Sequence, residues 1–477
     1  MLAEFQLEPD VYRLGQYAPV SVRDQVVRAY YLIDLLKDGL KLAVDTRLVI
    51  LGAGVAGVSA ALAAARLGVN HIVLVDQAAV PLSLQEKCQS RWVDPTQYDW
   101  PAAHWLDGQW PVKEASPRAF TAVTRPFDPL VAALAQDWSL DFENRLAARR
   151  HQIKARYLTK VDAWSRTTTG RIEVRLQDPA NRKHLPPEYA DLLLVTLGFG
   201  KERSQLPNAA NAAAPFEGID FWATDRFQKR DAGVPAITPG SNLVVSGAGD
   251  GALQDFIRLA TGLPTVAAIM QKAWNCGPAA APWKLALANA WHWKEQATLA
   301  LALAPSPITK CEILSRLHKR YVDAIDQFAK TSDWRSFKSW LDSLVLPRRP
   351  GTLKILLKCK HFGECYPLNQ AAALLVIQYL EDIGAPSVEV QTALMSTTAL
   401  SGHVCGTGCW GQPHSITLAR GTSCSVDDKA VATWSSHKTS KMDSQGIVVR
   451  HGIEPLQRPG LPPQYYLSQQ PVPAHLP

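Results

Sequence analysis

The 477-residue chain has no run of 18 uninterrupted apolar residues, so we expect no helix that crosses a membrane. Its first residues, MLAEFQLEPDVYRL, contain neither a basic stretch nor an apolar stretch, and a secretory signal is therefore not expected. Without such a signal, the eight cysteines are expected to be reduced. These absences predict a cytoplasmic protein whose thiols serve metal binding or redox chemistry rather than structural disulfides.

A concentration of charge of one sign is also missing. The formal net charge is +7, which is small over this length, and the basic residues are scattered rather than gathered in a stripe. Pairs such as Arg149–Arg150 are more typical of a solvated surface than of a nucleic-acid interface. We therefore expect no nucleic-acid partner and only a modest preference for anionic ligands.

The strongest positive feature is the segment VILGAGVAGVSAALAAARLGVNHIVLVD, which runs from Val49 to Asp76. It predicts a strand, a glycine turn, an alanine-rich helix and a second strand that ends on an acid. Gly52, Gly54 and Gly57 have G-x-G-x-x-G spacing. The first glycine allows the tight turn, the second admits a pyrophosphate to the backbone, and the third lets the helix pack close to the strand. The N-terminus of the helix then offers N–H groups to the phosphates.

Asp76 lies 24 positions after Gly52, where a carboxylate accepts hydrogen bonds from a ribose hydroxyl pair. Together with the strands and the helix, this acid predicts a bound adenine dinucleotide. Ala56, in the first turn of the helix, and Gln77, beside the acid, are expected to line the same site. A Rossmann unit that keeps this shape and binds nothing is the alternative.

A second pattern of strand, glycine turn and helix follows, in which Gly247, Gly249 and Ala252 have G-x-G-x-x-A spacing. The acid expected 24 positions after Gly247 is absent, and Gln271 and Lys272 stand there instead. A neutral residue followed by a cation tolerates a 2′-phosphate, which favours NADP over NAD. This interpretation takes the apolar run at 266–270 as the next strand. Residues 282–345 are then expected to be almost entirely helical.

The order of these pieces resembles the flavoproteins with two dinucleotide-binding domains, a superfamily that holds disulfide reductases and flavin monooxygenases. The resemblance covers roughly residues 45–275 and rests on both glycine turns, on a meander strand at 170–176, and on VTLG at 195–198, which is similar to the family's ATG-like strand end. It implies that the first turn binds FAD, with Gly198 beside it, and that the second binds NAD(P)H. A flavin reduced by the nicotinamide would then act on a second, small-molecule substrate.

Two interpretations of the second turn stay open. In one, it is a nicotinamide-nucleotide turn. In the other, Gly249 and Asp250 form the Gly-Asp element with which family members hold the FAD ribityl chain. The helical, tryptophan-rich region after residue 262 would then be a substrate or partner domain.

The loop-rich segment 81–101 stands where such flavoproteins place residues beside the flavin ring. A surface loop held by its aromatic residues is the alternative. Cys88 has no partner in a C-x-x-C pair, so we expect a packed thiol and no dithiol relay in this domain. That favours monooxygenase-like or oxidase-like chemistry over disulfide reduction. The expected flavin contacts, in which an Arg reaches a phosphate or a ring carbonyl, are Gln85, Ser90, Arg91 and Trp92.

Cysteines and histidines near the C-terminus predict a candidate zinc site. Cys359-x-His361 and Cys365 lie in KCKHFGECYP, and Cys405 and Cys409 lie in GHVCGTGCW. Thiolates and imidazoles are ligands that tetrahedral zinc prefers, and short loops bring two of them together. The expected ligands are Cys359, Cys365, Cys405 and Cys409. Reduced buried cysteines, or a redox pair of Cys405 and Cys409 presented to the flavin, are the alternatives.

The sequence thus predicts an α/β protein in four parts. These are an N-terminal helical arm (1–46), a Rossmann-type FAD-binding domain with a β-meander (47–240), an NAD(P)-binding-like or helical substrate domain (241–345) and a mixed cysteine-containing region (346–477). The expected activity is that of an FAD-dependent oxidoreductase reduced by NADPH. The sequence leaves the oligomeric state open. A nucleotide-binding sensor or interaction protein without turnover, or a ubiquitin-activating-type adenylation fold, is the alternative; no catalytic acid or base is assigned.

Overall fold

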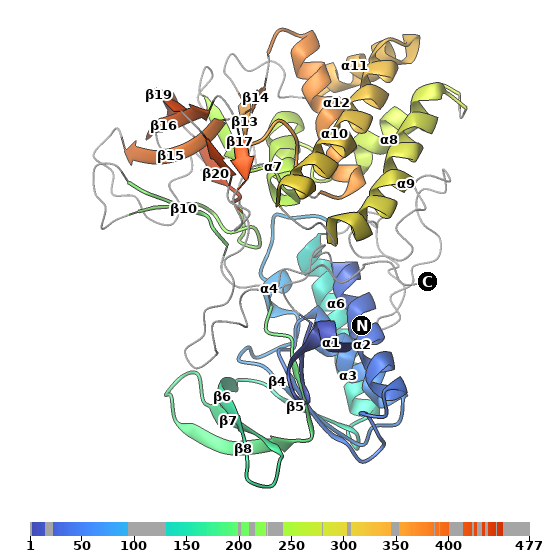
Figure 1. Ribbon diagram of the computed structural model, residues 1–477, viewed down its shortest axis with the longest axis vertical. Coiled ribbons are helices and arrows are strands. Elements are labelled where there is room, and N and C mark those ends of the chain that lie inside the picture. Colours follow the sequence, from blue (N-terminus) through green and yellow to red (C-terminus); the bar gives the residue numbers. More distant parts are fainter. Residues whose placement is uncertain are drawn as a thin grey trace. The chain divides into compact units, whose positions relative to one another are not determined.

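The computed structural model describes most of the chain, which divides into two compact units: unit 1 contains residues 1–201 and 454–477, and unit 2 contains residues 202–453. Both units combine helices with sheets of parallel strands, which confirms the predicted α/β class (Figure 1). The described residues are 2–14, 22–93, 130–198, 202–208, 215–225, 227, 242–278, 280–302, 307–344, 353–363, 365–385, 387–390, 392–399, 414–421, 424–426, 432–434, 437–444 and 446–451.

Unit 1 is built on a six-stranded sheet with the order β1-β2-β9-β3-β4-β5, in which every pair except β1–β2 is parallel. Parallel strands buried on both faces need continuous apolar runs, and LVIL in β3 and LLLV in β9 supply them. The strands are β1 (Gln6–Glu8), β2 (Val11–Arg13), β3 (Arg47–Leu51), β4 (His71–Val75), β5 (Ile153–Arg156) and β9 (Leu192–Val195).

Helices and an antiparallel meander complete unit 1. The alanine-rich α3 is buried along almost its whole length and packs against both α2 and the sheet. The predicted meander is confirmed, since the apolar side of β6-β7-β8 packs against the sheet around Val49 and Val174. The helices are α1 (Leu2–Phe5), α2 (Val22–Asp38), α3 (Val55–Arg66), α4 (Ser83–Glu86) and α6 (Val131–Ala148), and the meander strands are β6 (Lys160–Arg166), β7 (Ile172–Gln177) and β8 (His184–Ala190).

Unit 2 contains a four-stranded parallel sheet with the order β14-β13-β12-β20. An antiparallel sheet, β15-β16-β19, packs beside it through Ile416 and Leu418, which share a core with Val244 and Leu356. The parallel strands are β12 (Leu243–Ser246), β13 (Leu353–Leu357), β14 (Val388–Val390) and β20 (Gly446–Val449). The others are β10 (Gln205–Leu206), β11 (Phe216–Glu217), β15 (Thr392–Ala399), β16 (His414–Gly421), β17 (Cys424–Val426), β18 (Ala432–Trp434) and β19 (His437–Ser444).

A long helical insertion separates β12 from its neighbour β13. The strand predicted at 266–270 is wrong, because these residues begin helix α8. A short apolar run fits a buried helix as well as a strand, and the alanines of VAAIM favour the helix. The helical prediction for 282–345 is confirmed by α9, α10 and α11. The helices of unit 2 are α7 (Asp250–Thr261), α8 (Ala267–Asn275), α9 (Pro282–Ala302), α10 (Pro307–Ala329), α11 (Ser332–Ser343) and α12 (Pro367–Asp382).

Candidate dinucleotide site

The first glycine turn joins β3 to α3 and is closed on one side and open on the other. Gly52 has a φ of +104°, and a Cβ there would lie 2.6 Å from the carbonyl oxygen of Thr196. A Cβ on Gly57 would collide with the carbonyl oxygen of Gly52. At Gly54, by contrast, a Cβ would meet nothing within 4 Å. The backbone at Gly54 is therefore approachable, as a diphosphate bound at a helix N-terminus requires.

Thr196 holds this turn from the neighbouring strand. It follows β9, and its buried hydroxyl lies 2.7 Å from the carbonyl oxygen of Leu51 and 2.9 Å from that of Gly52. Gly198, two residues later, has a φ of +81° and also faces open space. The VTLG segment thus lies against the glycine turn through Thr196, and the role of Gly198 in cofactor binding stays a prediction.

Asp76 is held at the same edge of the sheet, directly after β4. One carboxylate oxygen accepts a hydrogen bond from the amide of Ala53 at 2.5 Å, and the other accepts one from the amide of Ala78 at 2.7 Å. Ala56 is buried in the first turn of α3, whereas Gln77 is exposed beside the acid. The structure therefore brings the acid to the glycine turn and leaves its orientation fixed by two backbone donors.

The segment that follows Asp76 packs onto the glycine turn. The amide of Leu82 donates to the carbonyl oxygen of Ala53 at 3.0 Å, and further on Trp92 pairs with Leu130 at the start of α6. Ser90 and Arg91 are buried, Gln85 is partly exposed, and Cys88 is fully buried, as the prediction of a packed thiol requires. Residues 94–101 of the predicted flavin-ring segment lie outside the described residues, and the flavin contacts of the four predicted side chains stay a prediction.

The second glycine turn repeats the first within unit 2. It joins β12 to α7, and Gly247 has a φ of +144°. A Cβ on Gly247 would collide with the carbonyl oxygen of Arg450, which follows β20 as Thr196 follows β9. A Cβ on Gly249 would meet nothing within 4 Å. Both turns are therefore closed by a carbonyl from the adjacent parallel strand and are open at their second glycine.

Asp250 is engaged inside unit 2. One of its carboxylate oxygens accepts hydrogen bonds from the amide of Tyr366 at 2.8 Å and from the side chain of Asn369 at 2.7 Å, both at the start of α12. The carbonyl oxygen of Ala248 accepts from the amide of Gly363 at 2.7 Å and from the thiol of Cys365 at 3.2 Å. These contacts favour a glycine turn of the unit's own sheet over a Gly-Asp element for a ribityl chain.

The strand next to β12 is followed by a charged residue that the sequence analysis did not identify. Gln271 and Lys272 lie in α8, so the expectation that they follow the strand next to β12 is wrong. The strand next to β12 is β13, and the exposed Lys358 follows it directly, as Asp76 follows β4. The signal that would have found Lys358 is the apolar run LKILL before it.

His451 lies at the same edge of this sheet, two residues after the end of β20. Its Nε2 is 2.7 Å from the hydroxyl of Ser246, at the end of β12. Burial, and then the charges of Lys358 and Arg203, lower the pKa of His451 to about 4. Its ring is therefore neutral at pH 7, and positive charge at this edge comes from Lys358 and Arg203.

Of the four predicted zinc ligands, the structure describes Cys359 and Cys365, and these two do not share a group of metal-binding atoms. Cys359 lies with Cys311 and His361, whereas the thiol of Cys365 points to Ala248. Cys405 and Cys409 lie outside the described residues. The four-cysteine arrangement is therefore not supported, and Cys311 was missed because it lies 48 residues before Cys359 in the sequence.

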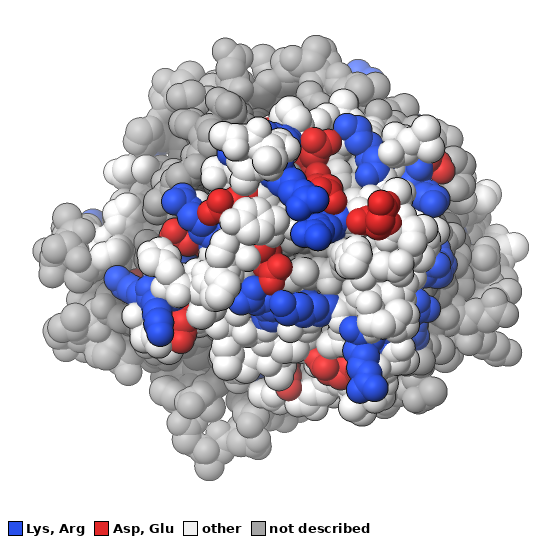
Figure 2. Space-filling view, turned by 90° about the horizontal axis from the view of Figure 1, so that it is seen from below, with Lys and Arg blue, Asp and Glu red and all other residues white. Residues whose placement is uncertain are grey.

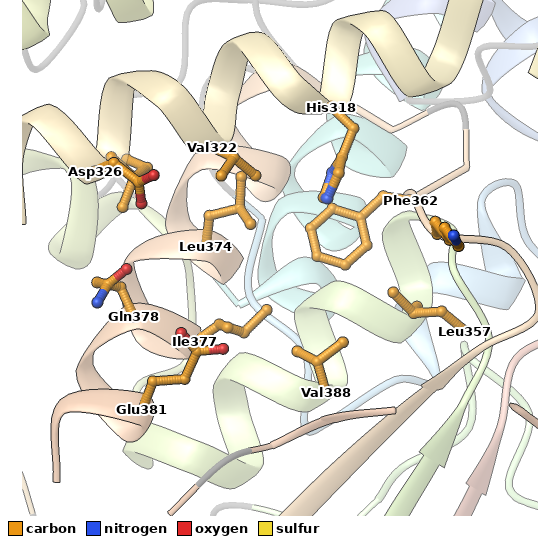
Figure 3. Close-up of a pocket in the computed structure, with 12 residues that line it drawn as sticks. His318, Val322, Asp326, Leu357, Phe362, Leu374, Ile377, Gln378, Glu381 and Val388 are labelled. Carbon is orange, nitrogen blue, oxygen red and sulfur yellow. The ribbon is translucent and has the colours of Figure 1, made fainter. Parts of the chain in front are cut away.

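A small cavity lies between α10, α12 and the edge of β13 and β14 (Figure 3). His318 and Phe362 meet edge to face at its wall, with ring centroids 4.8 Å apart. Its volume is about 190 Å³, which is below the range of pockets that bury drug-sized ligands. Burial, and then the nearby Asp326 and Asp382, raise the pKa of Glu381 at the other end of the cavity. The cavity is too small for a dinucleotide.

The surface gives no sign of a concentrated charge field on the face drawn in Figure 2. Lys and Arg side chains alternate there with Asp and Glu side chains across the residues that are coloured. Within the described ranges, no helix is both long enough and apolar enough to span a bilayer.

No protein-family model matches the chain, and neither does any curated protein. Among solved structures, the chain is similar to thioredoxin reductase from T. acidophilum, at 12% identity and a TM-score of 0.35 over 86% of this chain and 78% of that chain. It is also similar to a cadaverine monooxygenase from Erwinia amylovora with FAD bound, at 12% identity and a TM-score of 0.37 over 87% and 80% of the two chains.

A third similar structure is cyclohexanone monooxygenase from Rhodococcus sp. Phi1 bound to NADP⁺, at 17% identity and a TM-score of 0.29 over 45% of this chain and 36% of that chain. All three TM-scores are below 0.5, and all three identities are below 25%. At these TM-scores, the likeness transfers no residue roles to this chain.

Proposed function

We propose that the chain is an FAD-dependent oxidoreductase that is reduced by NADPH and acts on a small-molecule substrate. The observation that carries this proposal is the open backbone at Gly54, which faces the N-terminus of a buried 12-residue helix with Asp76 fixed beside it. A dinucleotide needs this combination, because amides and the helix dipole bind the diphosphate while a carboxylate accepts from a ribose.

The residues of unit 1 fit FAD in specific roles. The amides of the first turn of α3, at Val55, Ala56 and Gly57, would face the diphosphate. Asp76 accepts one amide hydrogen bond on each oxygen, and each oxygen keeps a lone pair for a ribose hydroxyl. Bound FAD would supply hydride acceptance and electron transfer, while the protein supplies position and electrostatics.

The second glycine turn supports a nicotinamide nucleotide as the electron donor. Gly249 is open to a diphosphate in the same way as Gly54. Lys358 follows β13 and is exposed, and Lys360 is exposed two residues later. A carboxylate at that position selects a ribose hydroxyl, whereas cations accommodate a 2′-phosphate, so the proposed donor is NADPH.

The cysteines favour monooxygenase-like or oxidase-like chemistry over disulfide reduction. Within residues 1–201, Cys88 is the single cysteine of the sequence, and its side chain is fully buried. A dithiol relay needs two accessible sulfurs next to each other, and this part of the chain offers one inaccessible sulfur. The electrons of the reduced flavin would then pass to oxygen or to an organic substrate.

An absorbance spectrum of the purified full chain tests this proposal. We expect flavin bands that bleach anaerobically with NADPH at least tenfold faster than with NADH, and that return when air is admitted. A colourless protein with no affinity for added FAD would contradict the proposal. A flavin that neither nicotinamide reduces would indicate a nucleotide-binding protein without turnover.

A further inference from the structure

Three side chains with metal-binding atoms meet in unit 2, and two of them come from the loop that also contacts the second glycine turn. Cys311 comes from the first turns of α10, and Cys359 and His361 come from the loop that follows β13. Their two sulfurs and one imidazole nitrogen all lie within 4.8 Å of one another, and the sulfur of Cys311 is 3.0 Å from Nε2 of His361. In the sequence, Cys311 lies 48 residues before Cys359.

The hydrogen bonds of His361 fix which ring nitrogen is available to a cation. Its Nδ1 lies 2.6 Å from the carbonyl oxygen of Phe362. A carbonyl oxygen accepts only, so Nδ1 carries the hydrogen, and Nε2 in the neutral ring directs its lone pair to the sulfur of Cys311. Metal-binding histidines have this arrangement, in which a backbone carbonyl orients the ring through the nitrogen that does not bind the metal.

The spacing and chemistry of the three atoms fit a borderline-soft divalent cation. Zinc binds thiolate sulfur at about 2.3 Å and imidazole nitrogen at about 2.0–2.1 Å, so tetrahedral ligands lie about 3.5–3.8 Å apart. The distances in this group, 3.0 Å and up to 4.8 Å, bracket that value. Two thiolates also balance the charge of a divalent cation. Magnesium and calcium prefer oxygen ligands, so this group would bind them weakly.

The loop that would hold the cation also holds the second glycine turn. Between His361 and α12, the amide of Gly363 and the thiol of Cys365 both contact the carbonyl oxygen of Ala248. A cation on Cys311, Cys359 and His361 would fasten this loop to α10 and so steady the turn from outside. His361 is buried, whereas both cysteines are partly exposed, which leaves a route for the ion and for a fourth ligand such as water.

We propose that Cys311, Cys359 and His361 form a zinc site that ties α10 to the loop after β13. The argument for this site does not use the proposed flavin chemistry, since all three ligands belong to unit 2. Cys359 and His361 nevertheless alternate in the sequence with Lys358 and Lys360, the cations of the proposed nicotinamide site. The zinc site also differs from the four-cysteine arrangement expected from the sequence, because Cys365 has a different role.

Metal content and cobalt spectroscopy of the full chain test this inference. Chelator-treated protein is titrated with Co²⁺ under anaerobic, reducing conditions, and the d–d bands of tetrahedral cobalt are followed at wavelengths longer than those at which flavin absorbs. We expect close to one zinc per chain as isolated, and at least tenfold weaker cobalt binding in Cys311→Ser and in Cys359→Ser. Cys365→Ser is the matched control and should bind as the wild type does.

Two results would overturn the inference. One is a wild-type chain with no more zinc or cobalt than Cys311→Ser contains. The other is a Cys311–Cys359 disulfide in protein isolated without reductant, found by peptide mass mapping, together with cobalt binding that both serine variants retain. Circular dichroism shows whether a serine variant misfolds. In that case the metal content of His361→Gln is measured instead, and zinc content equal to that of the wild type would overturn the inference. Flavin absorbance in the same samples reports separately on the proposed oxidoreductase.

Discussion

The hydroxyl of Thr196 lies 2.9 Å from the carbonyl oxygen of Gly52, so the strand β9 holds the glycine turn of the strand beside it. The carbonyl oxygen of Thr196 itself lies where a Cβ on Gly52 would have to be. One residue thus makes the first glycine obligatory and also secures the turn by a buried hydrogen bond. The geometry of the candidate FAD site therefore depends on a residue 144 positions away in the sequence.

Thr196→Val tests this dependence. The change keeps the shape of the side chain and removes the hydroxyl from beside two buried carbonyl groups, so we expect a loss of about 1–2 kcal/mol in the free energy of unfolding. FAD affinity should fall as well, because the turn loses its support. Urea unfolding and FAD titration measure the two effects, and Thr196→Ser should retain both properties. Equal stability of the Val and Ser variants would show that the hydrogen bond contributes nothing.

Gly54→Val separates binding from folding at the first turn. Gly54 has a φ of −72°, which any residue adopts, and its Cβ would enter open space. We expect the unfolding free energy to change by less than about 0.5 kcal/mol, while FAD binding weakens at least tenfold, or about 1.4 kcal/mol. Gly57→Ala should instead disturb folding, because its Cβ collides with the backbone at Gly52. Unchanged FAD affinity in Gly54→Val would remove the diphosphate from this turn.

Lys358→Gln tests the choice of nicotinamide nucleotide. If Lys358 faces the 2′-phosphate, kcat/KM for NADPH falls about tenfold, a loss of about 1.4 kcal/mol, and that for NADH hardly changes. Lys272→Gln, which alters the residue that the sequence indicated, is the matched control and should behave as the wild type. Anaerobic stopped-flow reduction with both nucleotides measures the ratio. If Lys272→Gln lowers kcat/KM for NADPH and Lys358→Gln does not, the position counted from Gly247 along the sequence would be the correct one.

His451 makes the stability of unit 2 depend on pH. Its pKa is about 4 in the folded chain, below the ordinary value of 6.5, so the unfolded state binds more protons between these values. Its contribution is therefore complete above about pH 6.5 and is lost as the pH falls towards 4. We expect the unfolding free energy to fall by about 1–2 kcal/mol more in the wild type than in His451→Gln between pH 7 and pH 5. Urea midpoints at the two pH values give this difference, and equal slopes would mean that His451 titrates normally.

The first unit was predictable from sequence because its pattern is local. Strand, turn, helix and second strand follow one another from Val49 to Asp76, so each spacing in the sequence is also a spacing in the structure. The same rule failed in unit 2, where helices from α8 to α11 intervene between β12 and β13. The residue expected to select the nucleotide was counted 24 positions from Gly247 along the chain, whereas the residue that follows the neighbouring strand, Lys358, is 111 positions from Gly247.

The neighbours of Cys359 could not be read from the sequence for a related reason. Proximity in the sequence grouped Cys359 with Cys365, whereas the structure pairs Cys359 with Cys311, from a helix, and turns Cys365 towards a backbone carbonyl. Contacts between a helix and a distant loop leave no spacing to count. The glycines, whose role is set by the backbone next to them, were readable, and side-chain clusters built from separate elements were not.

The carbonyl oxygen of Arg450 that closes the second turn belongs to the last described strand of its sheet, and β20 pairs with β12 from Leu243↔Gly446 onward. In unit 1, the described strands of the corresponding sheet all lie before residue 196. During synthesis, the first sheet can therefore assemble before β12 emerges, whereas β12 gains one neighbour only with β13 and keeps its other edge unpaired until about 200 further residues have emerged. An unpaired edge is open to mispairing, so we expect nascent unit 2 to be more prone to aggregation than nascent unit 1.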